Sequence, residues 1–388
     1  MCGIVGVLGN HEAAPLLVEA LKRLEYRGYD SWGVGYLDAA GNLLLPIKKV
    51  GAIGDLSAEH EIYQKESSTV IGQTRWATTG RVSEENAHPH VSMQGTVALV
   101  QNGIVENYLE LKEELVQHGY TFKSETDTEV IANWVEYELT KQEVPDFKDA
   151  VRATFARLAG RNAIVALHAG SGEMIAARQG SPLIIGVGKN EYFVASDIPA
   201  FLEYSNQVVY LDDGHLAHII EQGDTRHIAY YSLETGQPLE RRIVTVDLQP
   251  ESAEKGDFKH FMIKEIMEQK ETIRRAVNQE GADIERIAEM IKTAYGTFAV
   301  ACGTAGYASM IGEYLFAQVA HKHINYSVAS EFASFEPFLK DKTLMLVTSQ
   351  SGETADVLEA MEVAARKGVQ MVSFVNTRES TIAKKSQH

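Results

Sequence analysis

The pattern of apolar residues changes once along this chain of 388 residues, and that change limits the possible folds most. Before residue 240, short apolar runs typical of β-strands occur in groups, separate from groups of helical spacing. Beyond the polar stretch at 245–257, single strands and helices alternate. Strands and helices that occur in separate groups favour a layered α+β domain. Strands and helices that alternate one by one favour a doubly wound parallel sheet. We therefore expect domains at 2–240 and 259–388, joined by a linker at 241–258.

Helical spacing predicts the helices of both domains. In the first domain they are expected at 13–24, 108–118, 128–141 and 147–158. In the second they are expected at 260–277, 307–320 and 354–367, with apolar strands at 297–302, 325–329, 343–348 and 370–375.

Composition excludes several classes of function. Lys and Arg number 36 against 53 Asp and Glu, so the net charge of −17 offers no footprint for nucleic acid or an anionic membrane. No apolar run approaches the ~18 residues of a membrane-spanning helix, and the N-terminus lacks the features of a secretory signal. Two cysteines and a lone His-Pro-His at 88–90 predict neither a disulfide framework nor a metal site. We expect a cytoplasmic protein without metal or organic cofactor, and without a nucleic-acid or membrane partner.

Cys2 is the first candidate for chemistry. Removal of the initiator Met would place the Cys2 thiol and a free α-amino group on one residue. The amine has a pKa near neutrality and can act as a general base, while the thiolate is a strong nucleophile. The alternative is that Cys2 is a small buried residue of the strand that follows.

Asn102-Gly103 lies between apolar β runs and has two interpretations. This dipeptide is a strong signal for a type I′ hairpin turn. It is also suited to an oxyanion hole, in which the Asn amide and the Gly N–H stabilise a tetrahedral intermediate.

Two charged residues are candidates for holding a small zwitterion. Arg75, in the stretch GQTRWATTG, could bind a carboxylate bidentately, or form a surface ion pair. Asp127 could accept a hydrogen bond from an ammonium group. Its alternative role lies in the first turn of a helix, where Thr126 and Glu129 match a capping box.

Two loops of the second domain resemble anion sites. Both SQSGET, at 349–354, and CGTAGYAS, at 302–309, follow a predicted strand and open a helix. Hydroxyls and backbone N–H groups at such helix N-termini bind phosphate, and ligands of open α/β sheets lie at this edge. Helix capping by Ser and Thr remains the alternative. Neither loop is a dinucleotide or nucleoside-triphosphate motif, so a phosphorylated small molecule is favoured.

Together the motifs resemble the glutamine–fructose-6-phosphate aminotransferase (isomerizing) family, the glucosamine-6-phosphate synthases. They are MCGIVG, LEYRGYDS, TRWAT, NAHPH, NGIVEN, SETDTEVIA, ACGT and SQSGETAD, which run from residue 1 to residue 356. The resemblance implies an N-terminal-nucleophile αββα sandwich followed by a sugar-isomerase (SIS) subdomain. It implies hydrolysis of glutamine through a γ-glutamyl thioester and transfer of ammonia to fructose 6-phosphate, giving glucosamine 6-phosphate and glutamate. It also implies a homodimer.

The same resemblance assigns roles residue by residue. Cys2 would be the nucleophile, with Asn102 and Gly103 as the oxyanion hole. Glutamine would be bound by Arg75, Trp76, Thr78 and Asp127. The sugar phosphate would be bound by Thr304, Ser349, Gln350, Ser351 and Thr354.

This chain departs from the family in several places. Thr79 and Gln101 stand where His is frequent, and Ala305 stands where many members have Ser. Family members are also longer than this chain, and the acid/base Glu, ring-opening His and Schiff-base Lys of the isomerase reaction lie in their additional part. We therefore expect the chain alone to act as a glutaminase at most. A non-catalytic sugar-phosphate-binding regulator and an ammonia-supplying glutaminase subunit are the alternatives.

Overall fold

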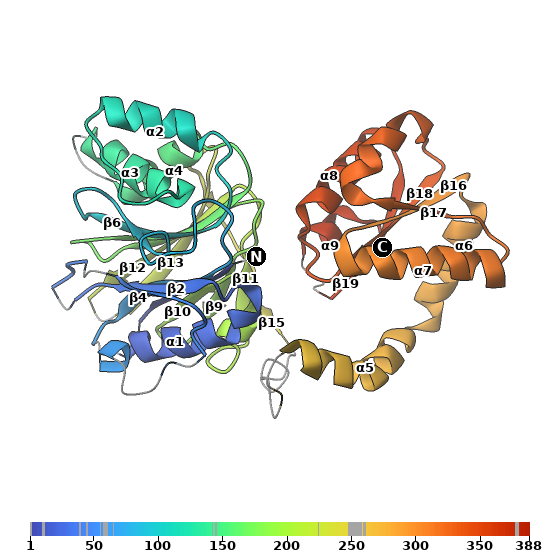
Figure 1. Cartoon of the computed structure of the whole chain (residues 1–388), viewed down its shortest axis with the longest axis horizontal. Coiled ribbons are helices and arrows are strands. Elements are labelled where there is room, and N and C mark those ends of the chain that lie inside the picture. Colours follow the sequence, from blue (N-terminus) through green and yellow to red (C-terminus); the bar gives the residue numbers. More distant parts are fainter. Residues whose placement is uncertain are drawn as a thin grey trace. The chain divides into compact units, whose positions relative to one another are not determined.

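The computed structural model shows two compact units, Met1–Asp257 and Phe258–His388 (Figure 1). It describes residues 2–388 apart from 10–11, 39, 44–45, 55, 57–60, 65, 142, 144–145, 224, 247–257, 259–260 and 377–379.

Two antiparallel sheets form the centre of the first unit. The first sheet has the order β15-β11-β9-β10-β1-β4-β2-β3, and the second has the order β14-β13-β12-β8-β7-β6-β5. Strands of the first sheet are β1 (Gly3–Leu8), β2 (Ser31–Tyr36), β3 (Ile47–Val50), β4 (Thr69–Arg75), β9 (Ile184–Val187), β10 (Tyr192–Ala195), β11 (Gln207–Tyr210) and β15 (Val244–Thr245). Strands of the second are β5 (His90–Val91), β6 (Val97–Gly103), β7 (Asn162–His168), β8 (Met174–Gln179), β12 (His215–Gln222), β13 (Thr225–Ser232) and β14 (Pro238–Leu239).

Each sheet buries one face in an apolar core that the two sheets share, and buries its other face under helices. Ile4 and Ile71 of the first sheet belong to the same fully buried cluster as Val100 and Val165 of the second. Because side chains alternate along a strand, the opposite faces also carry apolar residues. Helix α1 (Ala13–Arg23) covers that face of the first sheet. The second is covered by α2 (Tyr108–Gln117), α3 (Asp127–Thr140) and α4 (Phe147–Phe155) (Figure 1). The predicted αββα sandwich is confirmed.

A parallel sheet with the order β17-β16-β18-β19 forms the second unit. Its strands are β16 (Gly296–Ala301), β17 (Asn325–Val328), β18 (Thr343–Ser349) and β19 (Gln370–Val375). One face packs on α6 (Gly281–Thr293) and α7 (Gly303–Val319), the other on α8 (Ala355–Arg366) and α9 (Thr381–Lys385). The predicted doubly wound sheet is confirmed. The chain leaves β16 toward one neighbour and returns to β18 on the other side, so these two strands flank the switch point.

The structure differs from the sequence expectations in the start of one helix, in one additional helix and in the start of the linker. Helix α7 begins at Gly303, four positions before the expected start, because Gly303 adopts a φ of +56° that opens the helix directly after β16. Helix α6 was not expected at all. Val244 and Thr245 pair with β11, so the first sheet extends into the predicted linker. Residues 247–257 of that linker lie outside the described part of the chain.

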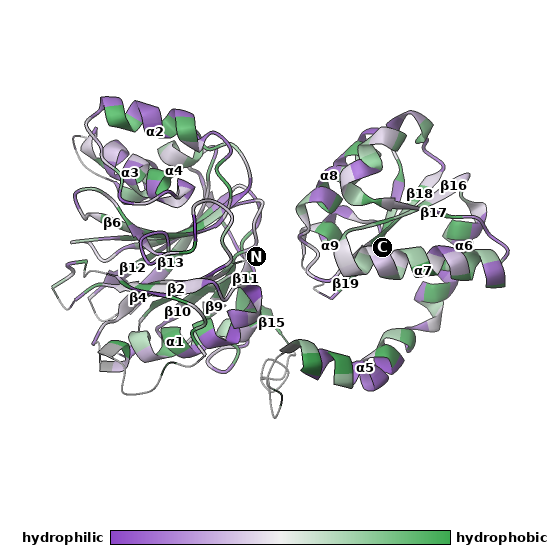
Figure 2. Cartoon of the chain, viewed as in Figure 1, coloured by the Kyte–Doolittle hydropathy of each residue, from purple (hydrophilic) through white to green (hydrophobic). Residues whose placement is uncertain are grey.

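Two helices of the second unit expose apolar side chains. On α5 (Phe261–Val277), Met262 and Val277 are each 73% exposed, and on α7 Ile311 and Val319 are 61% and 76% exposed. Figure 2 shows these helices with hydrophobic residues alternating with polar ones. Within the described residues, no helix has the length and apolar character to cross a membrane.

Candidate active site

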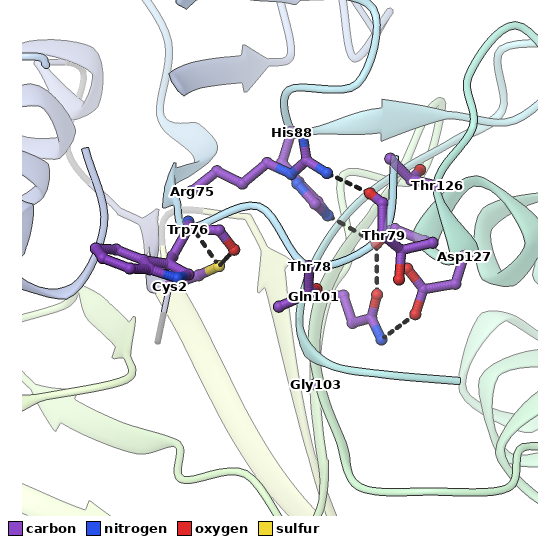
Figure 3. A pocket seen from close by; sticks show the side chains of 11 residues that line it. Cys2, Arg75, Trp76, Thr78, Thr79, His88, Gln101, Gly103, Thr126 and Asp127 are labelled. Atoms are coloured by element: carbon purple, nitrogen blue, oxygen red, sulfur yellow. Dashed lines mark hydrogen bonds between the residues drawn. The ribbon is translucent and has the colours of Figure 1, made fainter. Parts of the chain in front are cut away.

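The candidate active site of the first unit lies where β1 begins and β4 ends. These strands pair antiparallel with Gly3 opposite Thr74, which brings Cys2 beside Trp76. The Cys2 Sγ accepts a hydrogen bond from the Trp76 N–H at 3.1 Å and lies 3.4 Å from the Trp76 carbonyl oxygen. Figure 3 shows the pocket around this thiol. Its lining comprises Cys2, Arg75, Trp76, Thr78, Thr79, His88, Gln101, Gly103, Thr126, Asp127 and Thr128.

Cys2 is held by contacts to its backbone as well as to its sulfur. Its carbonyl oxygen accepts hydrogen bonds from Arg27 Nε at 3.1 Å and from Asn102 Nδ2 at 3.0 Å. Burial raises the pKa of the thiol, opposed by the hydrogen bond from Trp76 and by the nearby guanidinium charge of Arg75. The residue precedes β1 rather than lying within it, so its thiol faces a pocket and not the core.

Asn102 and Gly103 end strand β6, where they pair with Ala163 and Asn162 of β7. The hairpin-turn interpretation is therefore wrong, because the chain continues into α2 instead of reversing. Gly103 has a φ of +124°, and a Cβ atom there would lie 1.8 Å from the Arg161 carbonyl oxygen. Only glycine fits this position.

The Asn102 amide is oriented by a residue that the sequence did not single out. Gln73 Nε2 donates to Asn102 Oδ1 at 3.2 Å, which turns Asn102 Nδ2 toward Cys2. Gln73 is fully buried on β4, and its amide also donates to the Gln101 carbonyl. Gln73 is a polar residue within a strand whose residues are all buried. Its partner Asn102 lies on the other sheet, so no local sequence pattern predicts the contact.

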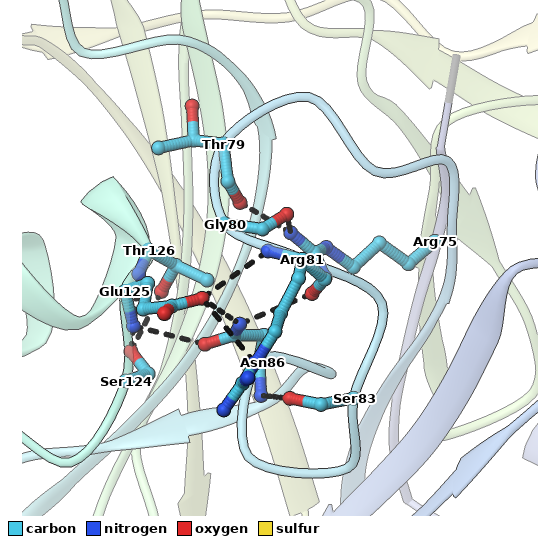
Figure 4. Close-up of polar contacts among 9 residues, drawn as sticks. All are labelled: Arg75, Thr79, Gly80, Arg81, Ser83, Asn86, Ser124, Glu125 and Thr126. Atoms are coloured by element: carbon cyan, nitrogen blue, oxygen red, sulfur yellow. Dashed lines mark hydrogen bonds and ion pairs between the residues drawn. The ribbon is translucent and has the colours of Figure 1, made fainter.

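Arg75 is 2% exposed, and no carboxylate of the described residues forms an ion pair with it. Its guanidinium donates to three loop carbonyls, those of Arg81 at 3.3 Å, Gly80 at 3.4 Å and Thr79 (Figure 4). The surface ion-pair interpretation is therefore wrong. Burial lowers the pKa of this guanidinium, while nearby acidic groups, Asp127 among them, oppose the shift. A buried cation bound only by neutral carbonyls retains its attraction for an anion.

The loop that supplies these carbonyls is fixed by Asn86. Asn86 Nδ2 donates to the Arg81 carbonyl at 3.0 Å and to Glu125 Oε2 at 2.8 Å, and its Oδ1 accepts from the Glu125 N–H at 2.9 Å (Figure 4). The residue is 2% exposed. It therefore ties the loop around Arg75 to the segment before α3. The NAHPH motif contains it, but nothing in the motif indicates this contact.

Asp127 is the first residue of α3 and lines the same pocket. The expected cap is present, since the Thr126 side chain accepts from the Glu129 N–H. The Asp127 carboxylate itself accepts from the Val105 N–H at 2.8 Å and from Gln101 Nε2 at 3.5 Å. Burial is the largest influence on this group and raises its pKa, although the hydrogen bonds and Arg75 act in the opposite direction.

Trp76 and Thr78 lie at the exposed rim of the pocket. The Trp76 indole stands edge-on to the Tyr29 ring, with centroids 5.3 Å apart. The cavity beneath them measures only about 20 Å³, close to the volume that one water needs.

The predicted phosphate-binding residues lie at the carboxyl edge of the parallel sheet. Thr304 is exposed in the first turn of α7, which follows β16, and 349–354 follow the adjacent β18. Gly352 has a φ of +68°, as the tight turn in this loop requires. Gln350 is exposed and Ser351 is half-buried.

Ser349 and Thr354 bond to each other instead of capping a helix. Ser349 Oγ lies 2.9 Å from Thr354 Oγ1 and accepts from the Gly352 N–H at 3.1 Å. Thr354 occupies the N-cap of α8 but makes no side-chain bond to its N–H groups. The capping alternative is therefore wrong for α8, because the Thr354 side chain accepts no hydrogen bond from the N–H groups that open this helix. Within the described residues, no group of three or more His, Cys, Asp or Glu is placed to hold a metal.

Comparison with known families agrees with this geometry. Residues 73–203 match the family model of the glutamine amidotransferase domain, and residues 291–388 match that of the SIS domain. The solved glutamine phosphoribosylpyrophosphate amidotransferase from B. subtilis covers 96% of this chain, with a TM-score of 0.53 and 18% identity, a likeness of fold. The class is thus an N-terminal-nucleophile amidotransferase fold followed by a SIS domain.

The curated relatives share one name. The chain is 42% identical over its whole length to glutamine–fructose-6-phosphate aminotransferase (isomerizing) of Caldanaerobacter subterraneus, and 40% identical over 99% of its length to that of Thermus thermophilus. It spans 63% of the length of both relatives. Over the part that it spans, the chain is similar to the glutamine–fructose-6-phosphate aminotransferases (isomerizing).

The raised pKa of Asp127 predicts a stabilising substitution. Because the folded state holds the proton more tightly than the unfolded state, stability falls as the pH rises through the raised pKa. We expect Asp127→Asn to stabilise the first unit at pH 7 by more than the ~0.5 kcal/mol typical of surface changes, and the gain to shrink in acid.

Urea unfolding followed by tryptophan fluorescence measures this effect, since the three tryptophans, at 32, 76 and 134, all lie in the first unit. Glu113→Gln, an exposed change on α2, is the matched control. A destabilised Asp127→Asn protein at pH 7 would contradict the argument.

Proposed function

We propose that the first unit hydrolyses glutamine through a covalent thioester on Cys2. The observation that carries this proposal is one pocket lined by a thiol, a buried cation and a buried carboxylate. Cys2, Arg75 and Asp127 come from the start of β1, the end of β4 and the start of α3. Glutamine bears a carboxylate, an ammonium group and a carboxamide, and each matches one of these groups.

We propose the following roles for the site residues. Arg75 binds the α-carboxylate of glutamine and Asp127 binds its α-ammonium group. Each of these two side chains is buried and carries the charge opposite to that of the ligand group it binds. The carboxamide carbon then lies at the Cys2 thiol. Trp76 and Thr78, at the rim, close over the bound molecule and exclude water.

The reaction proceeds in two steps. The α-amine of Cys2, free once residue 1 is removed, takes the thiol proton, and the thiolate attacks the carboxamide carbon. Asn102 Nδ2 and the Gly103 N–H stabilise the resulting oxyanion. Collapse releases ammonia, which takes the proton, and leaves a γ-glutamyl thioester. Water attacks this thioester, which releases glutamate and regenerates the Cys2 thiol.

We propose that the second unit binds the phosphate of fructose 6-phosphate at Thr304, Ser349, Gln350, Ser351 and Thr354. Support comes from the switch point between β16 and β18 and from the uncapped N-terminus of α8. In the family reaction, ammonia released in this way serves to make glucosamine 6-phosphate, and for this chain alone we propose the glutaminase step. This complete reaction is the one named for relatives of which the chain spans 63%.

The domain limits follow from these roles. We propose a glutaminase domain that begins at residue 2 and includes β15, a linker that follows β15, and a first SIS subdomain at 259–388, in line with the two compact units. The cytoplasmic location and the lack of nucleic-acid and membrane partners stay predictions.

The glutaminase activity is tested on protein whose mass shows that Met1 has been removed. We expect ammonia release from glutamine, lowered at least about a thousandfold in Cys2→Ala, because removal of a nucleophile abolishes the covalent route. Glucosamine 6-phosphate is measured in the same reactions with fructose 6-phosphate present. Release that does not depend on Cys2, or no release at all, would contradict the proposal. The latter result would favour a binding module.

The phosphate site is tested by calorimetric titration with fructose 6-phosphate. Thr304→Val should weaken binding by about tenfold or more, the effect of one lost hydrogen bond to a charged group. Thr293→Val is the control, because Thr293 ends α6 at the opposite edge of the sheet and bonds to the Glu289 carbonyl. Equal effects of the two changes would argue against a site at Thr304.

We also propose that the chain forms a homodimer through the second unit. The apolar residues exposed on α5 and α7 support it, because exposed apolar patches mark interaction surfaces. Sedimentation velocity should show a dimer at micromolar concentration that Ile311→Glu dissociates. A monomeric parent protein would contradict this arrangement.

A further inference from the structure

Gln73 brings a polar group into the region between the two sheets of the first unit. Side chains alternate along a strand, so Ile71, Gln73 and Arg75 lie on the same face of β4. Ile71 belongs to the apolar cluster that both sheets share, so this face meets the second sheet. The fully buried Gln73 amide therefore lies between the sheets, two positions before Arg75 on the same strand.

Two hydrogen bonds join Gln73 to strand β6 of the second sheet. Its Nε2 donates to the Gln101 carbonyl oxygen and to Asn102 Oδ1, the latter at 3.2 Å. A backbone carbonyl oxygen only accepts, so Gln73 must present its nitrogen to β6 and not its oxygen. The contact with Gln101 thus fixes which way the Gln73 amide is turned.

The Asn102 amide is fixed independently from its other end. Asn102 Nδ2 donates to the Cys2 carbonyl oxygen at 3.0 Å, and this oxygen also only accepts. Asn102 must therefore present its nitrogen to Cys2 and its oxygen to Gln73. A reversed Asn102 amide would set two oxygens together at Cys2 and two nitrogens together at Gln73. The two ends of this chain of bonds thus require the same orientation of Asn102.

The position of Gln73 has a cost. Its Oε1 is buried and has no hydrogen-bond partner among the residues that the structure describes. An apolar side chain of similar size would not incur the desolvation cost of such an atom. A glutamine at this position is therefore better explained by the two bonds that it donates than by packing of the core.

We propose that Gln73 is a positioning residue for amide hydrolysis, which holds the Asn102 amide nitrogen beside Cys2 from the opposite sheet. The proposal rests on the proposed glutaminase function, in which Asn102 Nδ2 donates to the oxyanion. One N–H of this nitrogen is held by the Cys2 carbonyl, and the other is the donor assigned to the oxyanion. Gln73 acts only through Asn102. Strand β4 then sets both ends of bound glutamine, through Arg75 at the α-carboxylate and through Gln73 at the carboxamide.

Kinetics of Gln73→Met test this role on full-length protein from which residue 1 has been removed. The change keeps the length of the side chain and removes its donor. The oxyanion exists only in the transition state and the intermediates near it, so kcat should fall about tenfold while KM for glutamine stays within about twofold. The dissociation constant of the product glutamate, measured by calorimetry, should also stay within about twofold.

Thr154→Val is the matched control. Thr154 is a fully buried residue of α4 whose hydroxyl donates to the Ala150 carbonyl at 2.9 Å, and it does not line the pocket. Loss of this buried hydrogen bond should leave kcat within about twofold of the parent value. Urea unfolding followed by tryptophan fluorescence checks that each variant is folded.

A double-mutant cycle with Asn102→Ala separates positioning from general structural support. Asn102→Ala should lower kcat about a hundredfold, the effect of one lost oxyanion donor. In that background Gln73→Met should lower kcat by less than about twofold, because its partner is already absent. A structural role would give the same tenfold loss in both backgrounds. Where Gln73→Met does not fold, Gln73→His, which keeps a ring N–H, replaces it in the cycle and the same coupling is expected.

The outcomes separate this inference from the proposed function. Additive losses in the cycle, a change in KM alone, or an unchanged kcat in Gln73→Met would overturn the role of Gln73 and leave the glutaminase intact. Absence of Cys2-dependent hydrolysis in the parent protein would overturn both.

Discussion

The geometry of the active site depends on one backbone pairing, that of β1 with β4. Gly3 lies opposite Thr74, and this register sets the residue before β1 against the residues after β4. A shift of one residue would turn Cys2 away from the Trp76 backbone and reverse the faces of both strands. The pairing is held by apolar residues on both faces of the sheet, so the position of the thiol follows from the packing of the whole sandwich.

Two buried groups of opposite charge, Arg75 and Asp127, line the same pocket. Arg75 is surrounded by loop carbonyls and Asp127 by an N–H group and an amide, and the two form no ion pair with each other. Burial disfavours the charged form of both, which is why their pKa values move in opposite directions. In the proposed binding mode, a ligand that carries both opposite charges relieves both costs at once.

Much of this arrangement was predictable from the sequence, and the limits of prediction have a physical origin. Apolar periodicity located most helices and strands because it reports burial within one element. It did not locate α6. The Asn-Gly signal at residues 102–103 was ambiguous because a turn and a strand end both accept glycine at positive φ. The pairing of β6 with β7 decided between them.

The sequence by itself determined the two fold classes and the chemical identity of the groups at the site. Side-chain chemistry and apolar spacing are local properties that can be read directly from the amino-acid sequence. Only the tertiary structure decided which atoms meet. Gln73 orients Asn102 and Asn86 fixes the loop around Arg75, through contacts 29 and 39 residues apart in the chain. Such contacts exist only after the two sheets have packed, because no local pattern brings these side chains together.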